Sequence, residues 1–124
     1  MTTPDAIIDL SAYKRAAVLR EQQRRQFASD RRAAAWLVAR KAGALLTNEF
    51  GANRVLVFGS LAHGHWFGPR SDIDLAASGI PADLFWRAWS ALDAIGSSFE
   101  INLIALETAT ASLRTTIEEE GVEL

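Results

Sequence analysis

The sequence VLVFGS at residues 55–60, followed by SDIDL at residues 71–75, decides the fold of this chain. The first stretch predicts a buried strand that ends in a tight turn at Gly59, where the absence of a side chain lets the backbone bend. Successive side chains of a strand point to opposite faces, so Asp72 and Asp74 share one face while their apolar neighbours point into a core. Two acidic side chains therefore lie together beside a strand-to-helix turn.

Paired carboxylates next to a glycine turn indicate a site for a metal and a phosphate. Carboxylate oxygens are ligands that divalent cations prefer, so Asp72 and Asp74 are candidate metal ligands. The turn at Gly59 brings the Ser60 backbone N–H and hydroxyl to the start of a helix, where an anion can bind. Metal and phosphate together favour nucleotide chemistry.

The segments GSLAHG (59–64) and SDIDL (71–75), in this order after an apolar strand, resemble the signature of the minimal nucleotidyltransferases (MNT proteins). These are the smallest members of the DNA polymerase beta superfamily, and the resemblance covers roughly residues 35–124. Eleven residues separate Ser60 from Asp72, one more than in the usual family pattern. The resemblance implies that the two aspartates are catalytic and hold Mg²⁺, which bridges the triphosphate of ATP or another NTP.

The loop between the two motifs holds further candidates. Arg70 could pair with a phosphate, although a solvated loop charge explains it equally well. His63 and His65 are better explained as loop surface than as site residues, whereas Trp66 is a candidate ligand or partner contact. The candidate nucleotide-binding residues are Gly59, Ser60, Arg70 and Ser71.

The third acid of the family is where this sequence departs from the pattern. The strand INLI at residues 101–104 has the expected phase, which puts Asn102 at the position of the acid. Glu100 lies two residues earlier, on the same face. An asparagine can offer a carbonyl oxygen to a cation but cannot act as a base. Two alternatives stay open: Glu100 replaces the third catalytic acid, or Asn102 marks a weakened activity.

The resemblance also implies a function. MNT proteins transfer AMP, or another NMP, from an NTP to a hydroxyl, and many are antitoxins of a HEPN ribonuclease toxin encoded nearby. In that case the acceptor is a tyrosine of the toxin, and a hetero-oligomer is expected. The alternative is an antitoxin that has lost its chemistry and neutralises the toxin by binding alone. A free-standing enzyme acting on a small molecule or tRNA is disfavoured, because the chain offers no second substrate-binding domain.

The composition narrows the classes of protein to which this chain can belong. With 124 residues and no cysteine, one small domain without disulfides or thiolate metal sites is expected. No apolar run reaches the length of a membrane span and no signal sequence opens the chain, so we expect a cytoplasmic protein with no membrane partner. Residues 1–41 carry a net charge of +5 and residues 42–124 a net charge of −7. Because the whole chain is acidic, nucleic acid is not expected as a partner.

The N-terminal third predicts helix. Residues 12–50 contain no proline and one glycine, and good helix formers dominate them. Either one bent helix or two helices fit, with Gly51 as the terminating residue. We divide the chain into a basic helical extension at 1–28, which meets another chain, and a nucleotidyltransferase domain at 29–124.

The remaining elements alternate. They predict an α/β (α+β) fold, with a small mixed sheet and helices packed mainly on one face. Phe85, Trp86 and Trp89 share a helix face, so core packing is expected for them. The predicted strands are 54–58, 72–78 and 99–106, and the predicted helices are 60–64, 81–95 and 108–120, with Pro81 in the first turn of the second.

Overall fold

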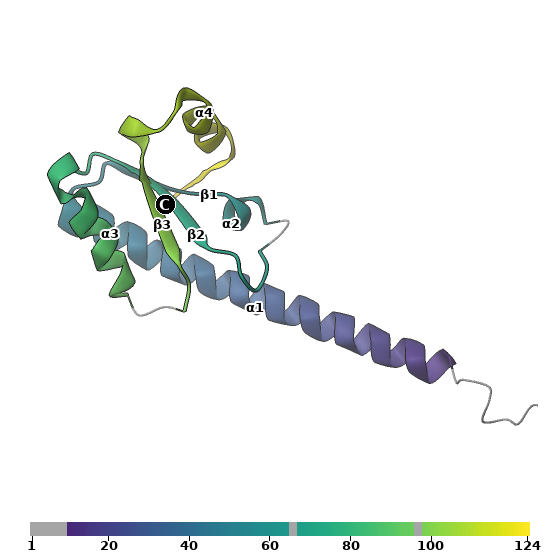
Figure 1. The fold of residues 1–124 in the computed structure, drawn as a ribbon. Helices are drawn as coiled ribbons and strands as arrows, with labels where there is room; N and C mark the ends of the chain where they lie inside the picture. Colours follow the sequence, from purple (N-terminus) through teal and green to yellow (C-terminus); the bar gives the residue numbers. More distant parts are fainter. Residues whose placement is uncertain (1–9, 65–66, 96–97) are drawn as a thin grey trace, which may run out of the picture.

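One helix, α1 (Leu10–Phe50), runs for 41 residues, and its C-terminal part lies against the sheet (Figure 1). The computed structural model describes residues 10–64, 67–95 and 98–124. Of the two alternatives for the N-terminal third, a single continuous helix is therefore the one that forms. Gly51 follows it with φ of 75°, a conformation that glycine adopts without strain, and the Ala52 N–H donates to the Leu46 carbonyl at 3.0 Å.

The sheet has four strands in the order β3-β2-β1-β4. β1 (Arg54–Phe58) pairs antiparallel with β2 (Ile73–Ser78), and β2 pairs parallel with β3 (Ile101–Ala105). These three strands confirm the prediction from sequence. The fourth, β4 (Val122–Glu123), was not predicted; it is two residues long and pairs antiparallel with β1.

Helices cover mainly one face of the sheet, as predicted. Alanines and Leu46 of α1 are fully buried on this face, where small side chains let the helix approach the strands closely. α3 (Phe85–Asp93) packs beside α1 on the same face through Ala88 and Leu92. On the second face, α4 (Ala111–Glu120) buries Ile117 in a smaller cluster with Leu56 of β1 (Figure 1).

Two predicted helices begin later than expected. Pro81 precedes a 3-10 turn, η2 (Ala82–Leu84), and lies outside the first turn of α3, which starts only at Phe85. The last predicted helix, 108–120, begins only at Ala111 as α4, and a 3-10 turn, η3 (Leu106–Thr108), precedes it. Thr110 caps α4, because its side-chain oxygen accepts a hydrogen bond from the Leu113 N–H at 3.2 Å. α2 (Ser60–His63) follows β1, as predicted.

The N-terminal part of α1 projects beyond the sheet (Figure 1). Its large apolar residues are exposed, including Leu10 at 59% and Tyr13 at 66%. The helix is continuous across residues 28 and 29, so the division into an extension (1–28) and a domain (29–124) stays a proposal. Among the described residues, no helix is long and apolar enough to cross a membrane.

The packing of α1 on the sheet predicts the effect of truncating Leu46. This side chain is fully buried, so Leu46→Ala leaves a cavity and is expected to lower the free energy of unfolding by about 2–5 kcal/mol. Leu37, 59% exposed on the same helix, is the matched control, and Leu37→Ala should change stability by about 0.5 kcal/mol or less. Chemical denaturation measures both, and equal losses would contradict the described face of α1.

Candidate active site

The two aspartates lie at the start of β2, the strand that pairs on both sides. Asp74 is in register with Phe58 of β1 and with Asn102 of β3. Ile73 is fully buried toward α1, whereas the aspartates are partly exposed on the opposite face. The alternation predicted from sequence is therefore confirmed, and Asp72 and Asp74 share a face.

Asn102 joins this pair through its side-chain amide. Its Nδ2 donates to Asp72 Oδ2 at 3.4 Å and to Asp74 Oδ1 at 3.2 Å. One amide group thus bridges the two carboxylates. The structure brings these three side chains together at neighbouring strand ends.

Glu100 lies at the same end of the sheet but apart from this cluster. Its backbone carbonyl accepts a hydrogen bond from the Ile73 N–H at 2.9 Å, which places it across from Asp72. The residue is exposed, and its carboxylate makes no hydrogen bond or ion pair with any part of the chain that the structure describes. Of the two candidates for the third catalytic position, only Asn102 contacts the aspartates.

Two features of the site raise the pKa of the Asp74 carboxyl, its partial burial and the negative charge of Asp72. Partial burial raises the pKa of the Asp74 carboxyl above its usual range. The Asn102 amide opposes this by stabilising the charged form, and the negative charge of Asp72 adds to the increase. A cation between the two carboxylates would remove the repulsion.

Because the side chain of Asp74 approaches it closely, position 59 requires a glycine. Its φ is 72°, and a Cβ at this position would lie 2.5 Å from Asp74 Oδ2. A side chain here would collide with the carboxylate as well as strain the backbone. Ser60, the next residue, begins α2, and its hydroxyl has no hydrogen-bond partner among the described residues. The predicted glycine turn therefore lies directly beside the paired acids.

The loop that leads into Asp72 is held by Ser71 and by an arginine of α1. The Ser71 Oγ accepts from the Gly68 N–H at 2.9 Å, so this hydroxyl oxygen stabilises the loop. Arg31 donates to the carbonyls of Gly68, at 3.1 Å, and Ser71, at 3.3 Å. Its guanidinium also stacks on Phe67 and Phe99, 5.5 and 4.4 Å from the ring centroids.

Sequence reasoning missed Arg31. It lies in an arginine-rich helix, where a solvated charge is the default expectation, and its two aromatic partners are far away in sequence. Arg70, a predicted nucleotide-binding residue, is exposed in the same loop and has no ion pair with a described residue. Of the four predicted nucleotide-binding residues, Gly59 and Ser60 form the turn beside Asp74, whereas Arg70 and Ser71 directly precede Asp72 in the chain.

The other singled-out side chains lie around this centre. His63 is exposed, with Nε2 3.2 Å from Glu120 Oε2, which agrees with its interpretation as loop surface. His65 and Trp66 lie outside the described residues.

The expectation of core packing for the α3 aromatics is wrong for one of them. Trp86 is 71% exposed and stacks on Trp89, with ring centroids 5.4 Å apart. Trp89 is half-buried, and its Nε1 donates to the Ile101 carbonyl at 3.1 Å. The helix turns Trp86 toward solvent because α3 has only a narrow buried face, formed by Ala88 and Leu92.

The side chains present fit Mg²⁺ better than a metal that needs a full protein cage. In the described part of the chain, no three or more His, Asp or Glu residues gather into a metal site. Mg²⁺ is commonly bound by one or two carboxylates, with water and substrate phosphates completing the shell. Asp72 and Asp74 supply two carboxylates, and rotation of the Asn102 amide would present a neutral carbonyl oxygen.

The raised pKa of Asp74 predicts a pH-dependent stability. The folded protein holds this proton more tightly than the unfolded chain, so the stabilisation is complete at low pH and decreases as pH rises through the raised pKa. Asp74→Asn cannot ionise, and it is expected to raise the free energy of unfolding at neutral pH without metal. This increase in the free energy of unfolding should become smaller as pH falls toward about 4, where an ordinary aspartate also takes up a proton.

Thermal denaturation of the unchanged protein and of Asp74→Asn, between neutral pH and about pH 4, measures this difference in stability. Asp83→Asn, at an exposed aspartate, is the control and should shift stability by about 0.5 kcal/mol or less. A gain from Asp74→Asn that stays constant with pH would contradict the described environment.

Solved structures of toxin–antitoxin proteins share this fold. A chain of a mutant MntA toxin–antitoxin superposes with a TM-score of 0.56 at 19% identity, over 68% of this chain and 70% of that chain. A chain of the toxin–antitoxin MntA-HepT gives 0.54 at 20% identity, over 71% and 69%. A chain of a toxin–antitoxin with AMP-PNP gives 0.52 at 22% identity, over 64% of each chain.

The sequence itself matches no protein-family model and no curated protein. The structural likeness confirms the fold that the MNT resemblance implies.

Proposed function

We propose that this protein is a Mg²⁺-dependent nucleotidyltransferase that acts as an antitoxin. It transfers AMP, or another NMP, from an NTP to a hydroxyl, most simply a tyrosine, of a HEPN-type toxin with which it forms a hetero-oligomer in the cytoplasm. The observation that carries the proposal is the pair Asp72 and Asp74 beside Gly59, in a fold shared with toxin–antitoxin structures. The similar chain from the toxin–antitoxin with AMP-PNP supports a nucleotide as the substrate.

Each residue of the site has a role in this proposal. Asp72 and Asp74 would hold Mg²⁺, and a metal bound there would supply positive charge to offset that of the triphosphate. Gly59 and Ser60 present a backbone surface and a free hydroxyl to the phosphates, and Arg70, exposed in the loop before Asp72, adds a positive charge. The acceptor oxygen bonds to the α-phosphorus, the bond to the leaving pyrophosphate breaks, and the hydroxyl proton passes to a base.

The identity of that base separates an efficient enzyme from a weakened one. Asn102 occupies the position in contact with both aspartates and cannot accept the proton. Glu100 can accept it, but its carboxylate is exposed and makes no described contact with the pair. These contacts favour a weakened activity over a substitute acid. They also support the second candidate function, an antitoxin that neutralises its partner by binding alone.

The metal assignment predicts the effect of removing both charges. The double variant Asp72→Asn, Asp74→Asn should weaken Mg²⁺-dependent ATP binding at least about tenfold, a loss of about 1.4 kcal/mol. Calorimetric titration of ATP with and without Mg²⁺ measures it. The matched control removes two exposed carboxylates elsewhere, by Asp83→Asn with Asp93→Asn. If the site variant bound ATP with unchanged Mg²⁺ dependence, the metal assignment would be wrong.

The third catalytic position predicts different effects of substitutions at Asn102 and Glu100. Asn102→Asp places a base beside the aspartates and is expected to raise nucleotide transfer by about tenfold or more, since a positioned base commonly contributes 10²–10⁴-fold. Glu100→Gln should change transfer little. The assay uses labelled ATP, Mg²⁺ and the protein encoded by the adjacent gene.

Other outcomes of this assay decide between the alternatives. Loss of transfer in Glu100→Gln, with no change in Asn102→Asp, would identify Glu100 as the base. Absence of transfer in every variant, with the partner still inhibited, would favour neutralisation by binding alone.

A further inference from the structure

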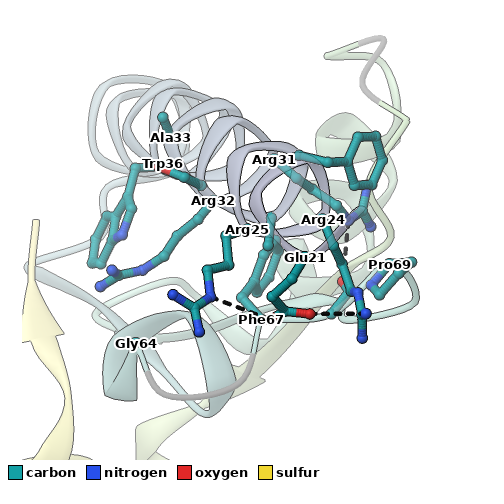
Figure 2. A pocket seen from close by; sticks show the side chains of 14 residues that line it. Glu21, Arg24, Arg25, Arg31, Arg32, Ala33, Trp36, Gly64, Phe67 and Pro69 are labelled. Carbon is teal, nitrogen blue, oxygen red and sulfur yellow. Dashed lines mark hydrogen bonds and ion pairs between the residues drawn. The ribbon is translucent and has the colours of Figure 1, made fainter. Parts of the chain in front are cut away.

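A groove separates α1 from the loop that leads to the aspartates. Residues 21–36 of α1 form one wall, and Gly64 with residues 67–69 forms the other (Figure 2). The groove encloses about 760 Å³, enough for several side chains of a ligand. We call it the arginine groove. It lies where the exposed part of α1 meets the domain, on the face of the sheet opposite the aspartates.

Positive charge dominates this groove. Four arginines line it against one glutamate, Glu21. Arg24 and Arg25 share that glutamate, with N–O distances of 2.8 and 3.2 Å, and both are largely exposed. Exposed ion pairs of this kind contribute little stability, so these arginines remain available to another carboxylate.

Arg32 is the strongest indication of a missing partner. Its Nε is buried and has no hydrogen-bond partner among the residues that the structure describes, and its guanidinium is so close to Gly64 that a Cβ there would lie 2.5 Å from Nη2. No ion pair joins it to any described residue. Buried donors of native proteins are nearly always satisfied, and an unpaired buried donor costs free energy. Because the chain itself covers the Nε, a partner can reach this guanidinium only through its Nη atoms, which make no hydrogen bond with a described residue.

The groove also has an apolar part. Phe67 and Trp36 line it together with Phe27, which is 59% exposed. Beyond it, the face of α1 that is buried from Ala35 onward continues toward the N-terminus through the half-buried Ala28 to the exposed Ala17 and Tyr13, where the sheet no longer covers it. A ligand that fills the groove can thus extend along α1.

We propose that the arginine groove binds an acidic segment of a partner protein, with carboxylates on Arg24 and Arg32 and separate apolar side chains against Phe27 on one side of α1 and Trp36 on the other. Arginine pairs with carboxylates bidentately, and arginine with aromatic residues is the usual composition of interface hot spots. The inference rests on the proposed function in that the segment belongs to the toxin.

Nucleic acid fits the groove less well than a protein segment. Glu21 lies among the arginines and would repel phosphates, and residues 42–124 carry a net charge of −7. An apolar wall also suits a side chain better than a sugar-phosphate backbone. The bound segment would contact residues 67–69, the start of the loop that Arg31 holds and that leads to Asp72.

Binding of the full-length chain to three labelled probes tests the proposal. The probes are the protein encoded by the adjacent gene, a short helical peptide with glutamates on one face and leucine and phenylalanine on the other, and a single-stranded RNA of similar length. The test variant is Arg24→Gln with Arg32→Gln. The matched control is Lys41→Gln with Arg87→Gln, two exposed cations outside both the groove and the N-terminal part of α1.

We expect the test variant to bind the partner protein at least about tenfold more weakly, since removing one member of a buried charge pair raises the dissociation rate. The control should bind within about twofold of the unchanged protein. ATP affinity and the melting temperature of each variant show that the fold is intact.

Groove-dependent binding of the acidic peptide without binding of the adjacent-gene product would uphold the groove and remove that product as the partner. Binding of the partner that the two variants affect equally would overturn the groove even if nucleotide transfer occurs. Binding of RNA alone, or of no probe, would also overturn it.

Discussion

Strand β2 is hydrogen-bonded on both sides, and these two registers determine the geometry of the candidate site. Its antiparallel pairing with β1 puts Asp74 opposite Phe58 and beside Gly59. Its parallel pairing with β3 puts the same aspartate opposite Asn102. A slip of one residue would turn the aspartates into the core and expose Ile73. The burial of the apolar face against α1 therefore fixes the acids on the other face.

α1 connects this sheet to the rest of the protein. Its alanine stripe packs on the strands, and Arg31, where the helix leaves the sheet, holds the loop before Asp72. The same loop forms one wall of the arginine groove. A partner bound under the exposed part of α1 would thus touch a segment that also positions the acids, and this links the proposed docking of a partner to the proposed chemistry.

The sequence correctly predicts those features of the fold that depend on residues close to one another in the chain. The strand period of two placed Asp72 and Asp74 on one face, and the glycine turn at Gly59 marked the end of β1, because both depend on neighbouring residues. β4 was missed because two residues carry no period, and its pairing depends on β1. Trp86 was wrongly predicted to pack in the core, because helical spacing shows which aromatic residues share a face but not whether that face is covered. Arg31 was missed because its contacts join segments distant in sequence.

Paramagnetic relaxation by Mn²⁺ is the most direct test of the candidate site, because Mn²⁺ accepts the same oxygen ligands as Mg²⁺ and broadens the NMR signals of nearby protons. With ATP present, we predict that small amounts of Mn²⁺ broaden the Asn102 side-chain amide and the Gly59 and Ser60 backbone amides. Excess Mg²⁺ should reverse the effect. Amides of α1 around Leu46, on the opposite face, should be spared. Unaffected Asn102 and Gly59 signals, or broadening centred elsewhere, would contradict a metal–nucleotide site at Asp72 and Asp74.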